Sequence, residues 1–353
     1  MRRPRRPGHP ATTASEPARA HANNFDALRL GFAILVVYSH AHALSGYAEP
    51  VAWNGTLGNV AVHGFFAVSG YLVTGSFTRS RDLPQFSLRR ARRIVPGLVV
   101  AMVVATLLGR AFGGYTTNPV PFITNGPVWT LTWEAVAYVA VGLLGLVGVV
   151  TRAALPVVVA ACWLAYLVTI GTTDPFALAV APMLLVFAGG AVLWLHPELL
   201  RRGVVVAAAL GLLLTLDNET FAWVARHVTA VVPFLYAPTW TPVDVQTSIY
   251  LLCLPVVVVA LGRASWPFLR LPVDLSYGTY LYAWPVSQVA VALASREGRD
   301  MSPLALFVIT LVPTLLIATA SWFCVERPVL RFRRQRPGRR QERETTTGAA
   351  SGS

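Results

Sequence analysis

The stretch RRARRIVPGLVVAMVVATLLGRAFG, residues 89–113, has the pattern of a membrane-spanning helix with one basic end. Four arginines open it, and no charged side chain follows until Arg110. Because a helix needs about 20 mostly apolar residues to cross a bilayer, we expect residues 93–113 to span a membrane. The whole chain has 353 residues, 55% hydrophobic and only 13% charged. Soluble domains usually carry about a quarter charged residues, so the composition excludes a disordered protein and disfavours a soluble enzyme.

Similar apolar stretches recur along the chain and predict an all-α polytopic membrane protein with about ten transmembrane helices. The expected spans are residues 25–45, 57–77, 93–113, 127–150, 152–170, 176–195, 202–217, 244–262, 274–295 and 303–325. The segment 218–243 is rich in Trp, Tyr and Phe, which favour the membrane interface. We expect this segment to form an interfacial helix or a re-entrant piece and, as the one long outer loop, to contact the acceptor of any reaction.

The distribution of arginines predicts the orientation of the chain. An even number of spans puts both termini on one side. With the termini in the cytoplasm, the outer side holds only four of the 29 basic residues: Arg110, Arg226, Arg296 and Arg299. The positive-inside rule therefore predicts a cytoplasmic (plasma) membrane protein with both termini cytoplasmic. Arginines confined to tails and short loops also argue against nucleic acid as a partner, despite the net charge of +13.

Polar segments flank the apolar region. Residues 1–24 are rich in Arg and Pro, and residues 329–353 are rich in Arg and then in Ser, Thr and Gly, so we expect two disordered basic tails. The transmembrane domain is expected to cover residues 25–328. The 3 cysteines lie in separate apolar segments without a CxxC pair, and neither a disulfide framework nor a metal site is expected.

Ionisable side chains inside a span are costly and mark candidate sites. Arg29 and His40 share one face of the first expected span, about 16 Å apart along its axis. Asp26, three residues before Arg29, is a candidate partner for it. The pair indicates either a cavity-lining stripe with a base at its upper end, or an anchoring Arg and a His bonded to a neighbouring helix.

The arginine run at the expected cytoplasmic mouth of the third span is a candidate anion site. It consists of Arg89, Arg90, Arg92 and Arg93. Arg90 and Arg93 are neighbours on a helix surface, and their guanidinium groups suit bidentate contacts to phosphate. The alternative is ordinary anchoring by positive charge on the cytoplasmic side.

Two glutamates complete the ionisable candidates. Glu134 lies about two turns into the fourth expected span, where an acid indicates either a site or a structural hydrogen bond. Glu326 lies where the last span leaves the membrane, either in a functional role or paired with the arginine run. In the second span, Gly64, Ser69 and Gly70 favour close helix packing, and His63 is a weaker site candidate than His40.

In this order the motifs resemble the acyltransferase-3 family of integral-membrane acyltransferases. The matching elements are Phe25-Asp26-Ala27-Leu28-Arg29 with His40, Gly64-Phe65-Phe66, Ser69-Gly70-Tyr71, Arg93-Ile94-Val95-Pro96, Trp129-Thr130-Leu131 with Glu134, Ser276 to Tyr282, and Val325-Glu326-Arg327-Pro328. The resemblance covers residues 23–332. It implies transfer of an acyl group, often acetyl, from acyl-coenzyme A to a hydroxyl of a carbohydrate or related acceptor.

The resemblance also implies roles for individual residues. The Arg–x10–His element falls on Arg29 and His40, the RxxR element on Arg90 and Arg93 or with equal spacing on Arg89 and Arg92, and the glutamate of the ERP element on Glu326. Coenzyme A phosphates are then expected against the RxxR pair, and acyl-coenzyme A is a donor substrate rather than a resident cofactor.

The implied chemistry centres on His40. The imidazole would remove the proton from the acceptor hydroxyl, which attacks the thioester, and an acyl-His intermediate is the covalent alternative. Either Glu134 or Glu326 would orient a polar partner such as His40.

A proton-coupled transporter or exporter of a small solute is the competing interpretation. Buried His, Arg and Glu side chains are equally suited to a proton relay. The arginine run separates the two interpretations, because an acyltransferase must bind coenzyme A there and a transporter has no reason to.

Overall fold

The computed structural model describes residues 23–80, 82–113, 116, 118–170, 172, 174–231, 242–269 and 271–331. Within these residues the chain is mainly helical, and one two-stranded hairpin is its only sheet. Most of the two tails expected to be disordered, residues 1–22 and 332–353, lies outside the described residues.

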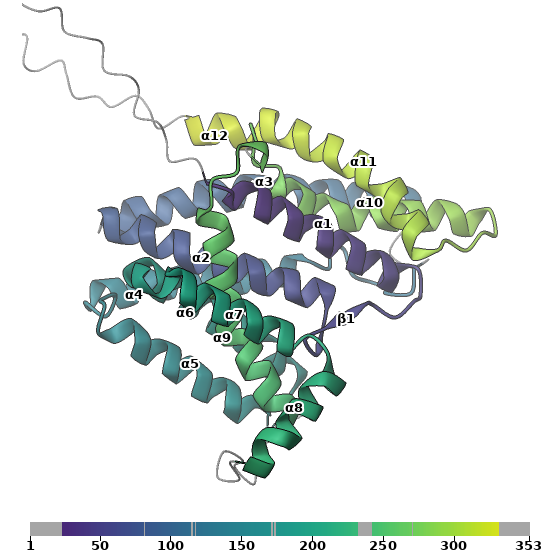
Figure 1. Ribbon diagram of the computed structural model, residues 1–353. Helices are drawn as coiled ribbons and strands as arrows, with labels where there is room; N and C mark the ends of the chain where they lie inside the picture. Colours follow the sequence, from purple (N-terminus) through teal and green to yellow (C-terminus); the bar gives the residue numbers. More distant parts are fainter. Residues whose placement is uncertain are drawn as a thin grey trace, which may run out of the picture.

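The helices pack side by side in one bundle (Figure 1). Their bounds are α1 Phe25–Leu44, α2 Leu57–Ser80, α3 Leu83–Phe112, α4 Val128–Leu146, α5 Ala154–Ile170, α6 Pro175–Leu195, α7 Arg202–Leu214, α8 Asn218–Val231, α9 Pro242–Arg263, α10 Ser276–Arg296, α11 Pro303–Ser321 and α12 Arg327–Arg331. Short 3-10 turns, Pro197–Leu200 and Pro267–Leu269, precede α7 and α10. The hairpin pairs β1, Val51–Ala52, with β2, Gly55–Thr56, in antiparallel register between α1 and α2.

A helix covers each of the ranges expected to span the membrane, which confirms an all-α polytopic membrane protein. Among the described residues, 7 helices are long and apolar enough to cross, or 8 if the bent pair α7–α8 is one span. Helix α5 is apolar but shorter, and α10 is not among the 7. The number of crossings, about ten from the sequence, and the side of the termini therefore stay predictions.

Helix α8 occupies much of the segment expected to be interfacial or re-entrant. It is bent by 108° from α7 at a short break, so the two helices do not continue in one direction. Residues 232–241 of that segment lie outside the described residues, and its last two residues begin α9.

Helix α3 begins ten residues before the expected start at residue 93. The Asp82 carboxylate accepts a hydrogen bond from the backbone N–H of Gln85 at 3.0 Å, and Pro84 follows in the first turn. Both features are typical of a helix start. The arginine run therefore lies within a helix that begins before the expected span.

The last span ends differently from the prediction. Helix α11 stops at Ser321, a single π-helical turn covers Trp322–Glu326, and α12 continues to Arg331. Helical structure thus extends three residues into the segment 329–353, which was expected to be a disordered tail.

Contacts between distant segments identify the two ends of the bundle. At one end, the Asn24 N–H donates to the Gly262 carbonyl at 2.8 Å. We call this the arginine end, because α3 also starts there and carries the arginine run. At the other, the Trp53 indole donates to the Leu212 carbonyl at 2.8 Å, and we call it the hairpin end.

Helix α2 lies in the middle of the bundle, in contact with α1, α4, α6 and α9. Its closest approach is to α6, where glycines of both helices face backbone. A Cβ on Gly70 would lie 1.9 Å from the Phe187 carbonyl oxygen, and one on Gly190 would lie 2.1 Å from the Ala67 carbonyl oxygen. The expected packing role of Gly70 is therefore confirmed, as in other membrane helix pairs with small interface residues.

Gly70→Ala is expected to lower the free energy of unfolding by about 1–3 kcal/mol, because a methyl group must push the α2 and α6 backbones apart. Gly31→Ala is the matched control, since a Cβ there meets no atom within 4 Å. Without a clash, alanine in a helix is favoured over glycine by up to about 1 kcal/mol. In detergent, the apparent melting temperature should fall for Gly70→Ala and rise for Gly31→Ala. Equal shifts in the two variants would contradict the close approach of α2 and α6.

Candidate active site

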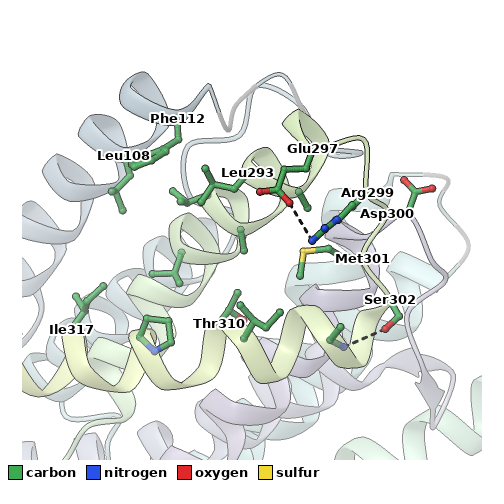
Figure 2. A pocket seen from close by; sticks show the side chains of 17 residues that line it. Leu108, Phe112, Leu293, Glu297, Arg299, Asp300, Met301, Ser302, Thr310 and Ile317 are labelled. Carbon is green, nitrogen blue, oxygen red and sulfur yellow. Dashed lines mark hydrogen bonds and ion pairs between the residues drawn. The ribbon is translucent and has the colours of Figure 1, made fainter.

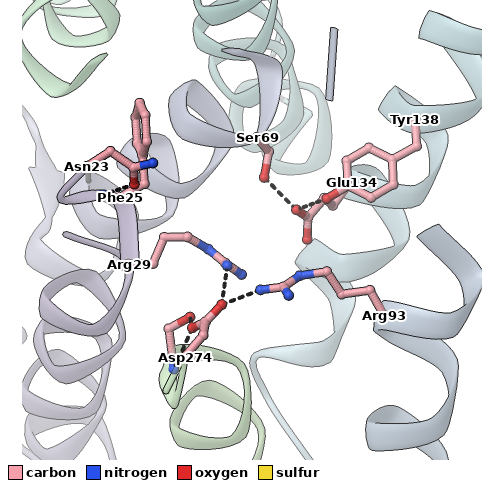
Figure 3. A network of polar contacts seen from close by, with 9 residues as sticks. Asn23, Phe25, Arg29, Ser69, Arg93, Glu134, Tyr138 and Asp274 are labelled. Carbon is pink, nitrogen blue, oxygen red and sulfur yellow. Dashed lines mark hydrogen bonds and ion pairs between the residues drawn. The ribbon is translucent and has the colours of Figure 1, made fainter. Parts of the chain in front are cut away.

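An ion-pair triad joins three helices at the arginine end (Figure 3). The Arg29 guanidinium on α1 donates to Asp274 Oδ2 at 2.6 Å, and Arg93 on α3 donates to the same oxygen. The Arg29 side chain is 16% exposed, Arg93 29% and Asp274 8%. Arg29 therefore pairs directly with Asp274. The candidate partner Asp26 forms no ion pair with Arg29 among the described residues, although it is close enough for the two charges to attract.

Asp274 is a site residue that the sequence analysis missed. It stands just before α10, where its Oδ1 accepts hydrogen bonds from the Ser276 backbone N–H at 3.1 Å and the Ser276 hydroxyl at 2.5 Å. These bonds resemble a helix N-cap and fix the carboxylate, so that Oδ2 faces the two arginines. Its signal in the sequence was an acid two residues before the Ser276 motif.

Glu134 lies beside the triad in a separate hydrogen-bond group (Figure 3). The Ser69 hydroxyl of α2 donates to Glu134 Oε1 at 2.6 Å, and the Tyr138 hydroxyl donates to the same oxygen. The Arg90 guanidinium sits over the Tyr138 ring, 5.8 Å from its centroid. Ser69 is thus more than a small packing residue, because its hydroxyl fixes a carboxylate inside the bundle.

The arginines of the run contact different residues. Arg93 joins the triad and Arg90 lies on Tyr138, so these two point to different partners. Arg89 donates to the Ser80 hydroxyl at the end of α2, and Arg92 is partly buried. Of the equally spaced pairs left open by the sequence, only Arg90 and Arg93 border the groups of Asp274 and Glu134.

Glu326 is 6% exposed in the π-helical turn after α11. The Ser321 hydroxyl donates to Glu326 Oε1 at 3.3 Å, and the Tyr282 hydroxyl donates to Ser321 at 3.1 Å. No ion pair joins Glu326 to an arginine among the described residues, so the expected direct pairing is wrong. A Cβ on Gly97 would lie 3.7 Å from Glu326 Cγ, which places this glutamate against α3 one turn beyond Arg93.

His40 is separate from the charged groups. Its ring meets the Trp284 ring of α10 edge-on, with centroids 5.0 Å apart, and no hydrogen bond reaches it from the described residues. Neither Glu134 nor Glu326 therefore orients His40. Trp284 is itself held by close packing, since a Cβ on Gly126 would lie 2.8 Å from its ring.

The uninterrupted helix α1 connects the two parts of the site. Arg29 lies in its second turn and His40 about three turns further on, on the same face, as the spacing predicted. The arrangement combines an anion-binding group at the arginine end with an imidazole whose nitrogens are unpaired among the described residues. It is suited to hold a negatively charged substrate and to move a proton some distance away.

A cavity lies apart from the candidate catalytic residues (Figure 2). Its volume is about 850 Å³, and it lies between α3, α10 and α11 near the hairpin end. The lining is mostly aliphatic, with Glu297 and Arg299 paired at its rim. It contains none of the candidate catalytic residues, so we do not place the reaction there.

Comparisons with known proteins agree with the sequence motifs. A family model described as an acyltransferase domain (Acyl_transf_3) matches residues 23–323. The chain is 25% identical over 341 residues to an "O-acetyl transferase" of Shigella phage Sf6, covering 88% of this chain and 96% of that protein. It is 27% identical over 383 residues to "Nodulation protein 10" of Rhizobium leguminosarum bv. viciae, covering 93% and 98%. No solved structure gives a significant match.

Proposed function

We propose that this chain, which belongs to the acyltransferase-3 family, transfers an acyl group from acyl-coenzyme A to a hydroxyl of a carbohydrate or glycosylated acceptor. Membership of the family makes it a membrane acyltransferase. The similarity to a protein named an O-acetyl transferase favours oxygen as the acceptor atom and acetyl as the acyl group.

One observation carries the proposal for the donor. Arg29 and Arg93 share a single oxygen of Asp274, and Ser276 occupies the other oxygen, so the triad keeps one positive charge in excess. Arg93 remains 29% exposed and can add a contact to an anion. Arginine suits phosphate because its guanidinium presents several N–H donors in one plane. We place the phosphates of coenzyme A at this end, which faces the cytoplasm if the positive-inside rule holds.

In the proposed reaction His40 is the general base. The thioester arm extends from the arginine end along the α1 face, and the neutral imidazole accepts the proton of the acceptor hydroxyl. The hydroxyl oxygen attacks the thioester carbonyl carbon, the carbon–sulfur bond breaks, and coenzyme A leaves as a thiolate that takes up a proton. In the covalent alternative, an imidazole nitrogen first takes the acyl group.

Binding of acetyl-coenzyme A to the purified protein in nanodiscs, measured by calorimetry, tests the donor site. Arg90→Ala/Arg93→Ala is expected to raise Kd at least about tenfold, because each hydrogen bond to a charged group contributes about 1.5–3 kcal/mol. Arg90→Gln should weaken binding while leaving the triad intact. The control is Arg152→Ala, which removes an exposed arginine outside the triad and the arginine run.

The possible results separate the two functional classes. Saturable binding that weakens in both arginine variants and persists in the control supports the acyltransferase. A folded sample that binds neither acetyl- nor longer acyl-coenzyme A contradicts the proposal and favours the transporter.

A further inference from the structure

A second, smaller cavity lies at the hairpin end, away from the triad. Its volume is about 270 Å³, and it is enclosed by the hairpin and by α2, α5, α6 and α9. Polar and aromatic side chains make up much of its lining. They include Trp53, Asn54, Asn59, His63, Asp244 and Tyr250.

The hairpin presents its two turn residues in an unusual backbone conformation. Trp53 and Asn54 connect the strands with φ of 51° and 63°. A two-residue turn of this kind favours Asn-Gly, and a bulky residue in the left-handed region costs roughly 1–3 kcal/mol. The surroundings hold Trp53 in place, because its indole donates to the Leu212 carbonyl and its ring stacks on Tyr250 at 5.5 Å with an 18° tilt.

Asn54 is fixed from the other side of the turn. Its amide donates to Gln246 Oε1 at 3.1 Å and to the Thr247 hydroxyl at 3.3 Å, both on α9. Gln246 in turn donates to the Thr215 carbonyl at 3.0 Å and to Asn218 at 2.9 Å. The turn, the α7–α8 corner and α9 therefore form one connected polar support beside the cavity.

His63 supplies a polar atom without a protein partner. Its Nδ1 lies 3.0 Å from the Tyr250 hydroxyl, and its Nε2 has no hydrogen bond to any described residue. His63 lines the cavity and its side chain is partly exposed, so Nε2 is accessible to water or to a ligand in the cavity.

We propose that this cavity binds one sugar ring of a neutral carbohydrate. Stacked aromatic rings offer apolar faces to the C–H side of a pyranose, while His63, Asn59 and Asp244 offer hydrogen bonds to its hydroxyls. The volume is slightly below the roughly 300 Å³ at which pockets for drug-sized ligands begin. The negative charge of Asp244 disfavours phosphate groups in this cavity, which makes it better suited to a neutral ligand than to coenzyme A.

The role of this cavity rests on the proposed function. It contains no His40, so the ring held here is a unit of the acceptor other than the one acylated. The cavity then anchors the acceptor at the end opposite the donor phosphates. Of the segment 218–243, which loop length favoured as the acceptor contact, Val243 lines this cavity.

The test uses the full chain in nanodiscs and saturation-transfer NMR with methyl glycosides of glucose, galactose, mannose, rhamnose and N-acetylglucosamine. At least one glycoside should receive saturation from the protein, and Trp53→Ala should weaken its binding at least tenfold. Asn59→Ala is the gentler variant, because the Asn59 side chain is exposed and is expected to leave the fold unchanged. Trp223→Ala is the matched control, an exposed tryptophan that packs on His227 on α8 outside the cavity.

The outcomes separate this inference from the proposed function. Glycoside binding that is lost in Trp53→Ala and Asn59→Ala but kept in the control supports the cavity, even if no acyl transfer is detected. Acyl transfer to a saccharide whose KM is unchanged by both variants leaves the enzyme function standing and overturns the cavity assignment. Absence of saturation transfer from all five glycosides also overturns it.

Discussion

His40→Ala is expected to lower the rate of acyl transfer by about 100- to 10,000-fold while the protein remains folded and membrane-inserted. On the α1 face shared with Arg29, the His40 imidazole is the only group between Arg29 and the end of the helix that can accept a proton from an acceptor hydroxyl. Its ring touches Trp284 and receives no hydrogen bond from the described residues, so it carries no structural contact that alanine would leave unsatisfied. Single-turnover transfer from radiolabelled acetyl-coenzyme A to acceptor measures the effect.

The control for this prediction lies two residues further along the helix. His42 Nδ1 contacts the Tyr38 carbonyl at 3.0 Å within α1, which occupies that nitrogen locally. His42→Ala should keep the transfer rate within a few-fold of the native protein. Full activity of His40→Ala, or an equal loss in both variants, would contradict a specific role of His40 in proton transfer. Unchanged binding of acetyl-coenzyme A to His40→Ala would show that the donor site is intact.

Local patterns predicted the helices and the shared face of Arg29 and His40, because both depend on residues within one helix. The direct partner of Arg29 was not predicted, because helical spacing relates only residues of the same helix. Helical spacing pointed to Asp26, whereas the carboxylate that binds it, Asp274, is 245 positions away in the sequence. Such a pairing depends on which helices are neighbours, and no spacing rule contains that information.

Other differences have equally specific causes. Hydropathy predicts where the third span starts, at residue 93, but it does not predict where helix α3 starts, which the capping residue Asp82 and Pro84 mark. Small residues in α2 indicated packing, which Gly70 confirms, but the same pattern hid the hydroxyl of Ser69, which donates to Glu134. A serine can fit a close helix contact and still supply a hydrogen bond, and only the neighbouring helix determines which matters.

Asp274→Ala is expected to lower the free energy of unfolding by about 3 kcal/mol, at the low end of the cost of breaking a buried ion pair. The substitution leaves the guanidinium groups of Arg29 and Arg93 close together without the carboxylate that both bind. We choose the low end because both arginines keep some exposure, 16% and 29%, so water relieves part of the repulsion. Unfolding titrations with SDS in mixed micelles measure the change.

An exposed ion pair of the same chain provides the comparison for Asp274. Arg152 and Glu198 are paired with side chains 62% and 51% exposed, so Glu198→Ala should cost only about 0–1 kcal/mol. Adding Arg93→Met to Asp274→Ala should restore part of the loss, because it removes one of the two repelling charges. If Asp274→Ala costs no more than Glu198→Ala, or if Arg93→Met restores nothing, the triad does not hold α1, α3 and the start of α10 together. A positive double-mutant coupling would establish that Arg93 and Asp274 interact directly, and that the carboxylate offsets the repulsion between the two arginines.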